Sequence, residues 1–334
     1  MILRSATIAS TLFFLSWSSA LGQIPSSSTV KSQGRCTQPI GRVINNGDSR
    51  FAAGSLLCRG DTLRPVPSAK VEVLCYLNRK VLWLGKGSVS GQCLPLVEQQ
   101  QTLQCTRHSR AKCPVRKGPA EGNSEPVLIA PYSSMVLNTQ PDLTWTKVAD
   151  ATSYQVRVSG AGVNWTETVV GNSHLVYPQK QPPLKFGNAY KVTIIANRGN
   201  SPVVASLATI NLINENQAQQ VKQIVQRLDN LNLPEDESAY LDLDSVYMSY
   251  GLLSQSIELL TTRVEAGSTT PEIFITLGDR YLEAGLPNQA KPLYQKAIKL
   301  AKRINNISQV EQAKAGLKKI ELYSQLPTKI KLDQ

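Results

Sequence analysis

The chain has 334 residues, 41% of them apolar, and a formal net charge of +12 at pH 7. This length favours about two or three domains and disfavours one unbroken core. The charge is uneven, because residues 23–122 contain 15 lysines and arginines against 5 acids, whereas residues 123–334 contain 20 against 19. A basic first domain favours polyanionic partners, although a solvated basic surface that aids solubility explains the same count.

The first residues have the pattern of an export signal over residues 1–22. Arg4 is followed by an apolar stretch from residue 6 to residue 17, and the small residues Ala20 and Gly22 precede Gln23. We therefore expect cleavage near Gly22, a flexible lead over residues 23–34, and an exported protein of the periplasm or the extracellular space. An uncleaved anchor is the alternative, but the stretch is shorter than the roughly 20 residues that a membrane span needs.

All the cysteines fall within one segment of the chain. An even number of clustered cysteines behind an export signal predicts disulfides. A metal site is the alternative, but the segment has no Cys-x-x-Cys pair and so lacks zinc spacing. The sequence leaves the pairing open among the 15 possibilities. The cysteines are Cys36, Cys58, Cys75, Cys93, Cys105 and Cys113.

The segment 35–117 is predicted to be an all-β domain. Two β-branched and apolar runs, residues 71–77 and 81–84, are separated by a short polar turn, as in a hairpin. The run from Gly54 to Leu63, followed by these two strands, resembles the periplasmic FecR-type domain over residues 38–95. The cysteines depart from that family. The resemblance implies a non-catalytic exported domain.

A basic run near the end of this domain is the best candidate for an anion-binding patch. It lacks interleaved aromatic residues, so no nucleic acid is expected as a partner, whereas a polyanionic envelope component would suit it. The patch consists of Arg107, His108, Arg110, Lys112, Arg116 and Lys117.

A linker is expected at residues 118–125 and a second β domain at residues 126–213. Apolar residues alternate along its strands, as in a half-buried sheet. The segments 141–145, 151–158 and 184–190 resemble those of a fibronectin type III sandwich. The resemblance implies that Trp145 is a core residue and that the hydroxyl of Tyr190 ties down the loop before it.

From residue 214 to residue 326 the apolar pattern is helical, with a tail over residues 327–334. Large and small residues recur after 34 residues, which resembles tetratricopeptide repeats at 237–270 and 271–304. The first copy departs from the family pattern, with Asp244 in place of a glycine and Arg263 in place of an alanine. Residues 308–323 are expected to form a further helix that continues the array.

The sequence carries none of the common catalytic motifs, so we expect no enzyme, no cofactor and no metal. The two histidines, His108 and His174, fall in different predicted domains. Asp242 and Asp244 could be a carboxylate pair, but two residues apart on a helix they point to different faces, and we interpret them as solvated acids. The fold class is therefore multidomain α+β: a disulfide-stapled all-β domain, a fibronectin-like sandwich and helical hairpins.

Two functions remain open. The first is an exported, non-enzymatic scaffold or adaptor that binds a protein or peptide in a groove along the helical hairpins. The second is binding of an envelope polymer or anionic surface through the basic domain, with the repeats serving self-association; only this mode should weaken steeply with salt. Acidic and apolar groups in the groove would suit a segment with some positive charge. The repeat resemblance implies these groove positions: Ser238, Leu241, Ser245, Met248, Ser249, Glu272, Ile275, Asp279, Leu282 and Glu283.

Overall fold

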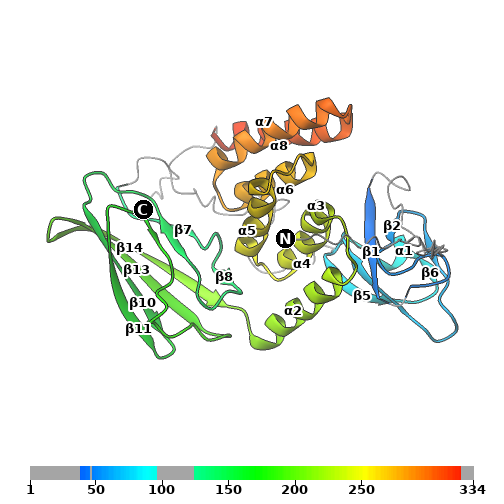
Figure 1. The fold of residues 1–334 in the computed structure, drawn as a ribbon, viewed down its shortest axis with the longest axis horizontal. Helices are drawn as coiled ribbons and strands as arrows, with labels where there is room; N and C mark the ends of the chain where they lie inside the picture. The colour runs from blue at the N-terminus through cyan, green and yellow to red at the C-terminus, as the bar shows by residue number, and fades with distance from the viewer. Residues whose placement is uncertain (1–37, 46, 96–123, 325–334) are drawn as a thin grey trace, which may run out of the picture.

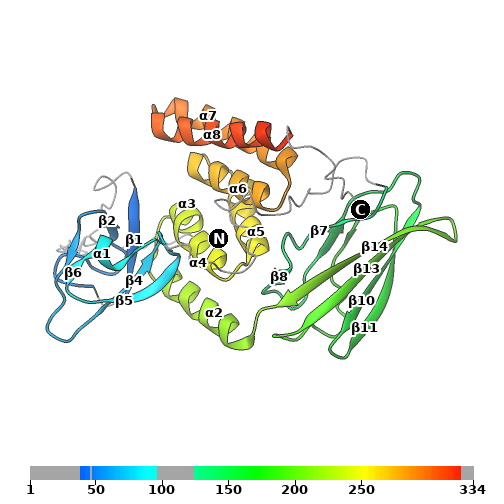
Figure 2. The same cartoon turned by 180° about the vertical axis from the view of Figure 1, so that it is seen from behind.

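The structure, a computed structural model, describes residues 38–45, 47–95 and 124–324. It has mixed α+β architecture in three parts, with a helical region between an N-terminal β domain and a β-sandwich (Figure 1). The view from behind shows the same order of parts (Figure 2). In the described part of the chain, no helix is long and apolar enough to cross a membrane.

The N-terminal domain is built around a four-stranded antiparallel sheet of order β2-β1-β4-β5. Its strands are buried on one or both faces, and Val43, Leu57 and Val73 are among the residues of its core. The second strand of the expected hairpin pair forms as predicted, whereas the first ends at Cys75, two residues early. The elements are β1 (Pro39–Asn45), β2 (Leu56–Cys58), β3 (Thr62–Leu63), β4 (Val71–Cys75), β5 (Lys80–Leu84), β6 (Gly87–Ser88) and α1 (Val89–Gln92).

A disulfide joins Cys75 at the end of β4 to Cys93 just after α1, with a distance of 5.4 Å between the two Cα atoms. Cys58 is disulfide-bonded as well. None of the cysteines in the described residues is free. The expected disulfides at Cys36, Cys105 and Cys113 lie outside the described residues.

The second domain is a sandwich of a five-stranded sheet, β11-β10-β13-β14-β8, and a three-stranded sheet, β12-β9-β7. All of its strand pairs are antiparallel except β14 with β8, which pair in parallel over two residues. The strands are β7 (Leu128–Ala130), β8 (Met135–Val136), β9 (Leu143–Trp145), β10 (Ser153–Gly160), β11 (Val163–Val170), β12 (His174–Leu175), β13 (Ala189–Arg198) and β14 (Ser201–Leu212).

The sandwich core follows from the alternation along β10 and β13, where every second residue is buried. Trp145 is 1% exposed and packs edge to face on Tyr154, so it is a core residue as predicted. Tyr190 is buried, and its hydroxyl accepts a hydrogen bond of 2.8 Å from the backbone N–H of Lys185. This bond fixes the loop before β13, which is the contact expected of this tyrosine.

The third part consists of helices packed as successive hairpins, α5 on α6, α6 on α7 and α7 on α8. Asn214 caps α2 by accepting a hydrogen bond from the N–H of Gln217, and a proline opens α6 and α7. The elements are α2 (Glu215–Asp229), α3 (Glu235–Glu237), a π-helical turn η2 (Ser238–Leu243), α4 (Asp244–Ser249), α5 (Leu253–Glu265), α6 (Pro271–Glu283), α7 (Pro287–Arg303) and α8 (Ile307–Ser324).

The ring of Tyr294 on α7 sets the spacing of the last three helices. A Cβ atom added to Gly278 on α6 would lie 2.9 Å from the ring, and one added to Gly316 on α8 would lie closer still. Only glycine therefore lets both helices reach the ring. The Tyr294 hydroxyl donates a hydrogen bond of 2.8 Å to Asp279 on α6.

The three parts share one apolar cluster. Val221 and Ile224 of α2 and Val246 of α4 pack in it with residues from both β domains. The N-terminal sheet contributes Leu74, among others, and the sandwich contributes Met135. The helical region thus buries its surface against both neighbours, rather than folding around a core of its own alone.

Candidate functional site

The predicted groove positions do not form one accessible surface. Ser245, Ile275 and Leu282 are buried, so they contribute to packing within the helical region. Ser249 and Glu283 are exposed, and the other five positions, Ser238, Leu241, Met248, Glu272 and Asp279, are partly buried.

The groove acids are already engaged with other side chains. Glu272 accepts a hydrogen bond from Gln309 on α8, and burial raises the pKa of its carboxyl. Asp279 accepts from the Tyr294 hydroxyl. Glu283 pairs with Arg280 at 2.8 Å. Since these carboxylates serve contacts inside the helical region, they offer little to a positively charged segment.

The predicted anion patch, Arg107, His108, Arg110, Lys112, Arg116 and Lys117, lies outside the described residues. The N-terminal sheet nevertheless supplies cationic side chains at a place that the sequence did not single out, its boundary with the helices.

Asp242 is not a solvated acid, which corrects the sequence interpretation. It is fully buried in η2 and accepts hydrogen bonds from Arg42 Nε at 2.9 Å and from the Tyr76 hydroxyl at 2.6 Å. Arg42 is also fully buried; its other nitrogens donate to Glu237 at 2.6 Å and to the backbone carbonyl of Gly54 at 2.7 Å. A buried arginine of β1 thus joins the N-terminal sheet to the first helices of the helical region.

The protonation states in this cluster follow from its geometry. Burial alone would lower the pKa of Arg42, but Tyr76, Asp242 and Glu237 outweigh that effect and raise it above its ordinary value. Burial and the adjacent Asp242 raise the pKa of Tyr76, so its hydroxyl keeps the proton that it donates. Arg42 is therefore charged, and its charge is compensated inside the protein.

Asp244 is buried as well, and it lies on another face of the same helix. Arg280 on α6 donates to both of its oxygens, at 2.7 and 2.6 Å, and the Ser256 hydroxyl donates to Oδ1. Asp244 stands where the second repeat has Gly278 and Ser256 where it has Ala290, and both departures from the repeat pattern take part in one buried ion pair. The first repeat is therefore adapted to a charged contact.

Arg263, the other departure from the repeat pattern, ties α5 back to α3. Its Nε donates to Asp236 at 2.8 Å, and it also pairs with Glu235. Asp236 accepts two further hydrogen bonds, from Ser268 at 2.7 Å and from Thr270 at 2.6 Å.

A cleft of about 410 Å³ lies between the N-terminal sheet and helices α2 and α4. Sites between domains are common places for ligands. Its lining combines apolar side chains with cations and amides, and Ser249 of the predicted groove is among them. The lining residues are Leu74, Arg79, Lys80, Val81, Gln220, Gln223, Ile224, Arg227, Val246, Ser249 and Tyr250.

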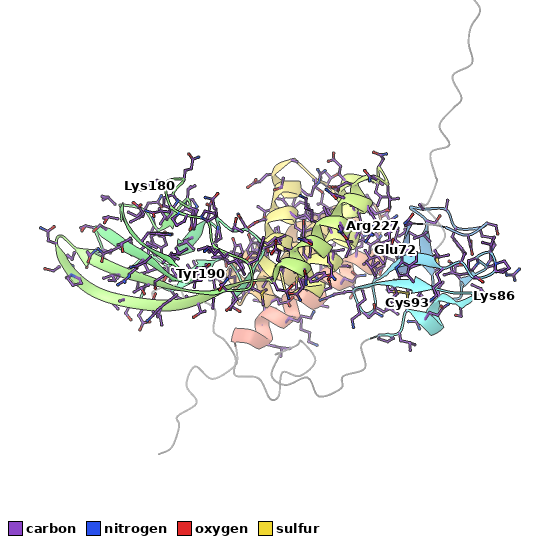
Figure 3. All side chains as sticks on the ribbon, turned by 90° about the horizontal axis from the view of Figure 1, so that it is seen from below. Glu72, Lys86, Cys93, Lys180, Tyr190 and Arg227 are labelled. Atoms are coloured by element: carbon purple, nitrogen blue, oxygen red, sulfur yellow. A yellow bond between two sulfur atoms is a disulfide. The ribbon has the colours of Figure 1, made fainter. Side chains whose placement is uncertain are left out.

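Arg227 is the cation of this cleft that comes from a helix. One of its terminal nitrogens lies 3.3 Å from Oε1 of Glu72, whose side chain is 3% exposed, while Arg227 Nε is buried without a hydrogen-bond partner. Figure 3 shows Glu72 and Arg227 next to each other where the sheet meets α2. The guanidinium thus already holds one carboxylate and has hydrogen-bonding capacity to spare.

The turn between β4 and β5 supplies the other two cations. Arg79 has a φ of 57°, a left-handed conformation that is uncommon for residues other than glycine. The Asn78 side chain accepts a hydrogen bond of 3.0 Å from the N–H of Lys80, which holds the turn. Lys80 is exposed, so its ammonium reaches solvent at the rim of the cleft.

A wider hollow of about 710 Å³ lies in the N-terminal domain, lined by the loop 64–69 with Thr62 and Lys86. It is formed within one domain, and Val66 in its loop is 72% exposed. Among the described residues, no cluster of histidine, cysteine, aspartate and glutamate could hold a metal ion. The cleft at the domain junction is therefore the better candidate site.

The sequence matches no family model, and it matches no curated protein. Among solved structures, there is a weak similarity to the fn3 domain of human collagen alpha-1(XX) chain, with 23% identity, a TM-score of 0.22, and coverage of 29% of this chain and 92% of that one. A β-1,2-glucanase from Parabacteroides distasonis matches with 11% identity and a TM-score of 0.24, over 62% of this chain and 35% of the enzyme.

Proposed function

We propose that the chain is a non-enzymatic binding protein that holds an acidic segment of another protein in the cleft between its N-terminal sheet and helices α2 and α4. The observation that carries the proposal is the placement of Arg79, Lys80 and Arg227 around an apolar floor. Of these three charges, Glu72 offsets one. A ligand with single carboxylates therefore matches the cleft better than a group of higher charge.

The floor of the cleft favours a polypeptide over a simple polyanion. Leu74, Val81, Ile224 and Val246 line it, and a carboxylate carried by a segment with apolar neighbours would bury those neighbours there. The amides of Gln220 and Gln223 offer donors and acceptors to a peptide backbone. This mode uses both regions singled out by the sequence, the basic domain and the helices.

The buried contacts of Arg42 support the proposal because they hold the two walls of the cleft together. Arg42 belongs to the sheet, and its partners Asp242 and Glu237 belong to the helices. A cleft whose walls are fixed before binding loses less conformational entropy when the ligand arrives.

We further propose that the helical hairpins are tetratricopeptide repeats, that the sandwich is of the fibronectin type III class, that the first domain is FecR-like and that the protein is exported. The glycine spacing around Tyr294 and the Tyr190 contact with Lys185 support the first two proposals. The Cys75–Cys93 disulfide supports export, since disulfides persist in oxidising compartments.

The test is a binding measurement on the full chain by fluorescence anisotropy, with a labelled synthetic peptide of alternating glutamate and leucine. The matched probe replaces each glutamate by glutamine. We expect the acidic peptide to bind more tightly, and its affinity to fall as salt is added. Lys80→Glu should weaken binding about fivefold or more, because an exposed ion pair contributes up to about 1 kcal/mol.

Lys86→Glu is the matched control. Lys86 is an exposed lysine of the same domain, it changes the net charge equally, and it lines the other hollow. Equal weakening by both variants would show that the overall field of the domain, and not this cleft, attracts the peptide. Equal affinity for the two peptides would contradict the proposal altogether.

A further inference from the structure

Strand β14 leaves most of one sheet edge unpaired. It pairs with β13 from Ser201 to Asn211, but on its other side it meets β8 only at Asn211 and Leu212. Residues 201–210 therefore have a strand neighbour on one side only. Backbone N–H and C=O groups along such an edge can accept a further strand.

The exposed side chains of this edge are uncharged. The alternation along β14 exposes Ser201, Val203, Ala205, Leu207 and Thr209. Val203 is 51% exposed and Leu207 is 60% exposed. No residue of the strand is charged, and its proline, Pro202, stands at the beginning. Natural edge strands usually carry charges, prolines or bulges that discourage pairing, so an edge of this length without charges is unusual.

The opposite edge of the same sheet shows the difference. Strand β11 pairs only with β10, but it carries Glu167. This carboxylate accepts from Lys180 at 3.1 Å and from Gln181 at 3.1 Å, so the loop that carries these two residues reaches across to the strand. One edge of the sheet is thus protected by charge and by a loop, whereas the β14 edge has no charge of its own.

We propose that β14 is a self-association edge, and that two copies of this chain pair their β14 strands antiparallel into one continuous sheet. With a two-fold axis at Ala205, Val203 of one copy lies opposite Leu207 of the other, and Ser201 lies opposite Thr209. Apolar side chains then meet apolar ones and hydroxyls meet hydroxyls, which is the self-complementarity that a two-fold interface requires.

Charge identifies a second copy as a demanding but consistent partner. Each chain carries a net charge of +12, so two copies repel one another wherever basic surfaces approach. The β14 edge contains no charged residue, so repulsion across the paired strands themselves is least there. Pairing should therefore become stronger as salt screens the remaining repulsion, which is opposite to the behaviour expected of peptide binding in the cleft.

The test is sedimentation equilibrium of the full chain over a range of protein and salt concentrations. We expect a reversible dimer whose fraction rises with salt. Leu207→Lys places two lysines near the paired strands and should shift the dissociation constant upward at least about tenfold. Val170→Lys is the matched control, since Val170 is 77% exposed on β11 at the opposite edge, and it should leave the dimer unchanged.

The symmetry axis gives a second readout that does not depend on the strength of the dimer. An Ala205→Cys chain should cross-link to its own copy under mild oxidation, whereas Val170→Cys should not. A chain that stays monomeric at high salt and gives no Ala205→Cys cross-link would overturn the proposal. Equal loss of the dimer in Leu207→Lys and Val170→Lys would also overturn it, because the contact would not then belong to this edge. Neither result bears on peptide binding in the cleft.

Discussion

The sandwich and the helical region are held together in different ways. The sandwich has an apolar core of its own, and its ion pairs, such as Arg198 with Asp150 at 3.2 Å, lie at the surface. The helical region buries charged pairs, Arg42 with Asp242 and Arg280 with Asp244. Burying charges costs desolvation, which is offset only where partners and hydrogen bonds are complete.

The difference shows which part of the chain depends on its neighbours. Removing one partner of a surface pair leaves a charge in water, whereas removing one partner of a buried pair leaves a charge without compensation. Because Arg42 belongs to β1 and Asp242 to η2, the helical region needs the N-terminal domain to complete its own interior. The sandwich needs no such contact for its core.

Arg42→Met provides the strongest test of this comparison. The variant leaves Asp242 buried without its cation, and we expect the free energy of unfolding to fall by about 3–5 kcal/mol. Chemical denaturation would measure it, with far-ultraviolet circular dichroism for the helices and tryptophan fluorescence for the sandwich. The helical signal should be lost first.

Arg198→Met is the control for that variant, since the side chains of Arg198 and Asp150 are 60% and 77% exposed. It should change stability by less than about 0.5 kcal/mol. If the two arginine variants cost the same, the contrast between buried and surface pairs would be wrong. Adding Asp242→Leu to Arg42→Met should recover part of the loss, because no uncompensated charge then remains.

Gly316→Ala tests the close packing inside the helical region. The new methyl group would overlap the ring of Tyr294, and overpacking of this kind costs about 1–3 kcal/mol. Alanine otherwise favours a helix over glycine by about 1 kcal/mol. The same substitution should therefore be stabilising in a Tyr294→Leu background, and thermal unfolding of the four chains of this cycle would show whether the sign reverses.

Local patterns predicted much of this fold. The period of 34 residues placed α6, α7 and α8 closely, since each helix must keep one apolar stripe toward its neighbours. Alternation likewise placed Trp145 and Tyr190 in the sandwich core. Such patterns report which face of an element is buried, but not which element covers that face.

The candidate site could not be predicted for that reason. The sequence suggested groove positions such as Ile275, which is buried, and it interpreted Asp242 as solvated. The partners of Asp242 are 200 and 166 residues away along the chain, in Arg42 and Tyr76. A signal existed, because an arginine within the apolar run of β1 requires a buried anion, but nothing in the sequence names that anion.

Tyr190→Phe is the corresponding test in the sandwich. It removes the hydrogen bond from the Lys185 N–H and leaves the ring packed, so we expect a loss of about 0.5–1.5 kcal/mol. Tryptophan fluorescence should report the change. The helical signal should unfold at an unchanged denaturant concentration, and an equal shift in both signals would mean that the sandwich is not independent.

The smallest expected effect concerns pH and the surface of the helical region. Burial would raise the pKa of Asp236, but hydrogen bonds from Thr270, Ser268 and Arg263 outweigh it and hold the pKa below its ordinary value. A carboxyl whose folded pKa is depressed adds stability above its unfolded pKa of about 3.9, and this stability is lost as the pH falls through the folded value.

Asp236→Asn keeps an oxygen that can accept from Thr270 and Ser268 but gives up the ion pair with Arg263. At neutral pH it should cost about 0.5 kcal/mol, the usual contribution of a pair that is largely exposed to solvent. Below about pH 4 the difference between the two chains should shrink, because the wild-type carboxyl is then taking up its proton. Urea denaturation monitored by circular dichroism at a series of pH values would measure both. A difference that stays constant down to pH 2 would show that Asp236 acts through its hydrogen bonds and not through its charge.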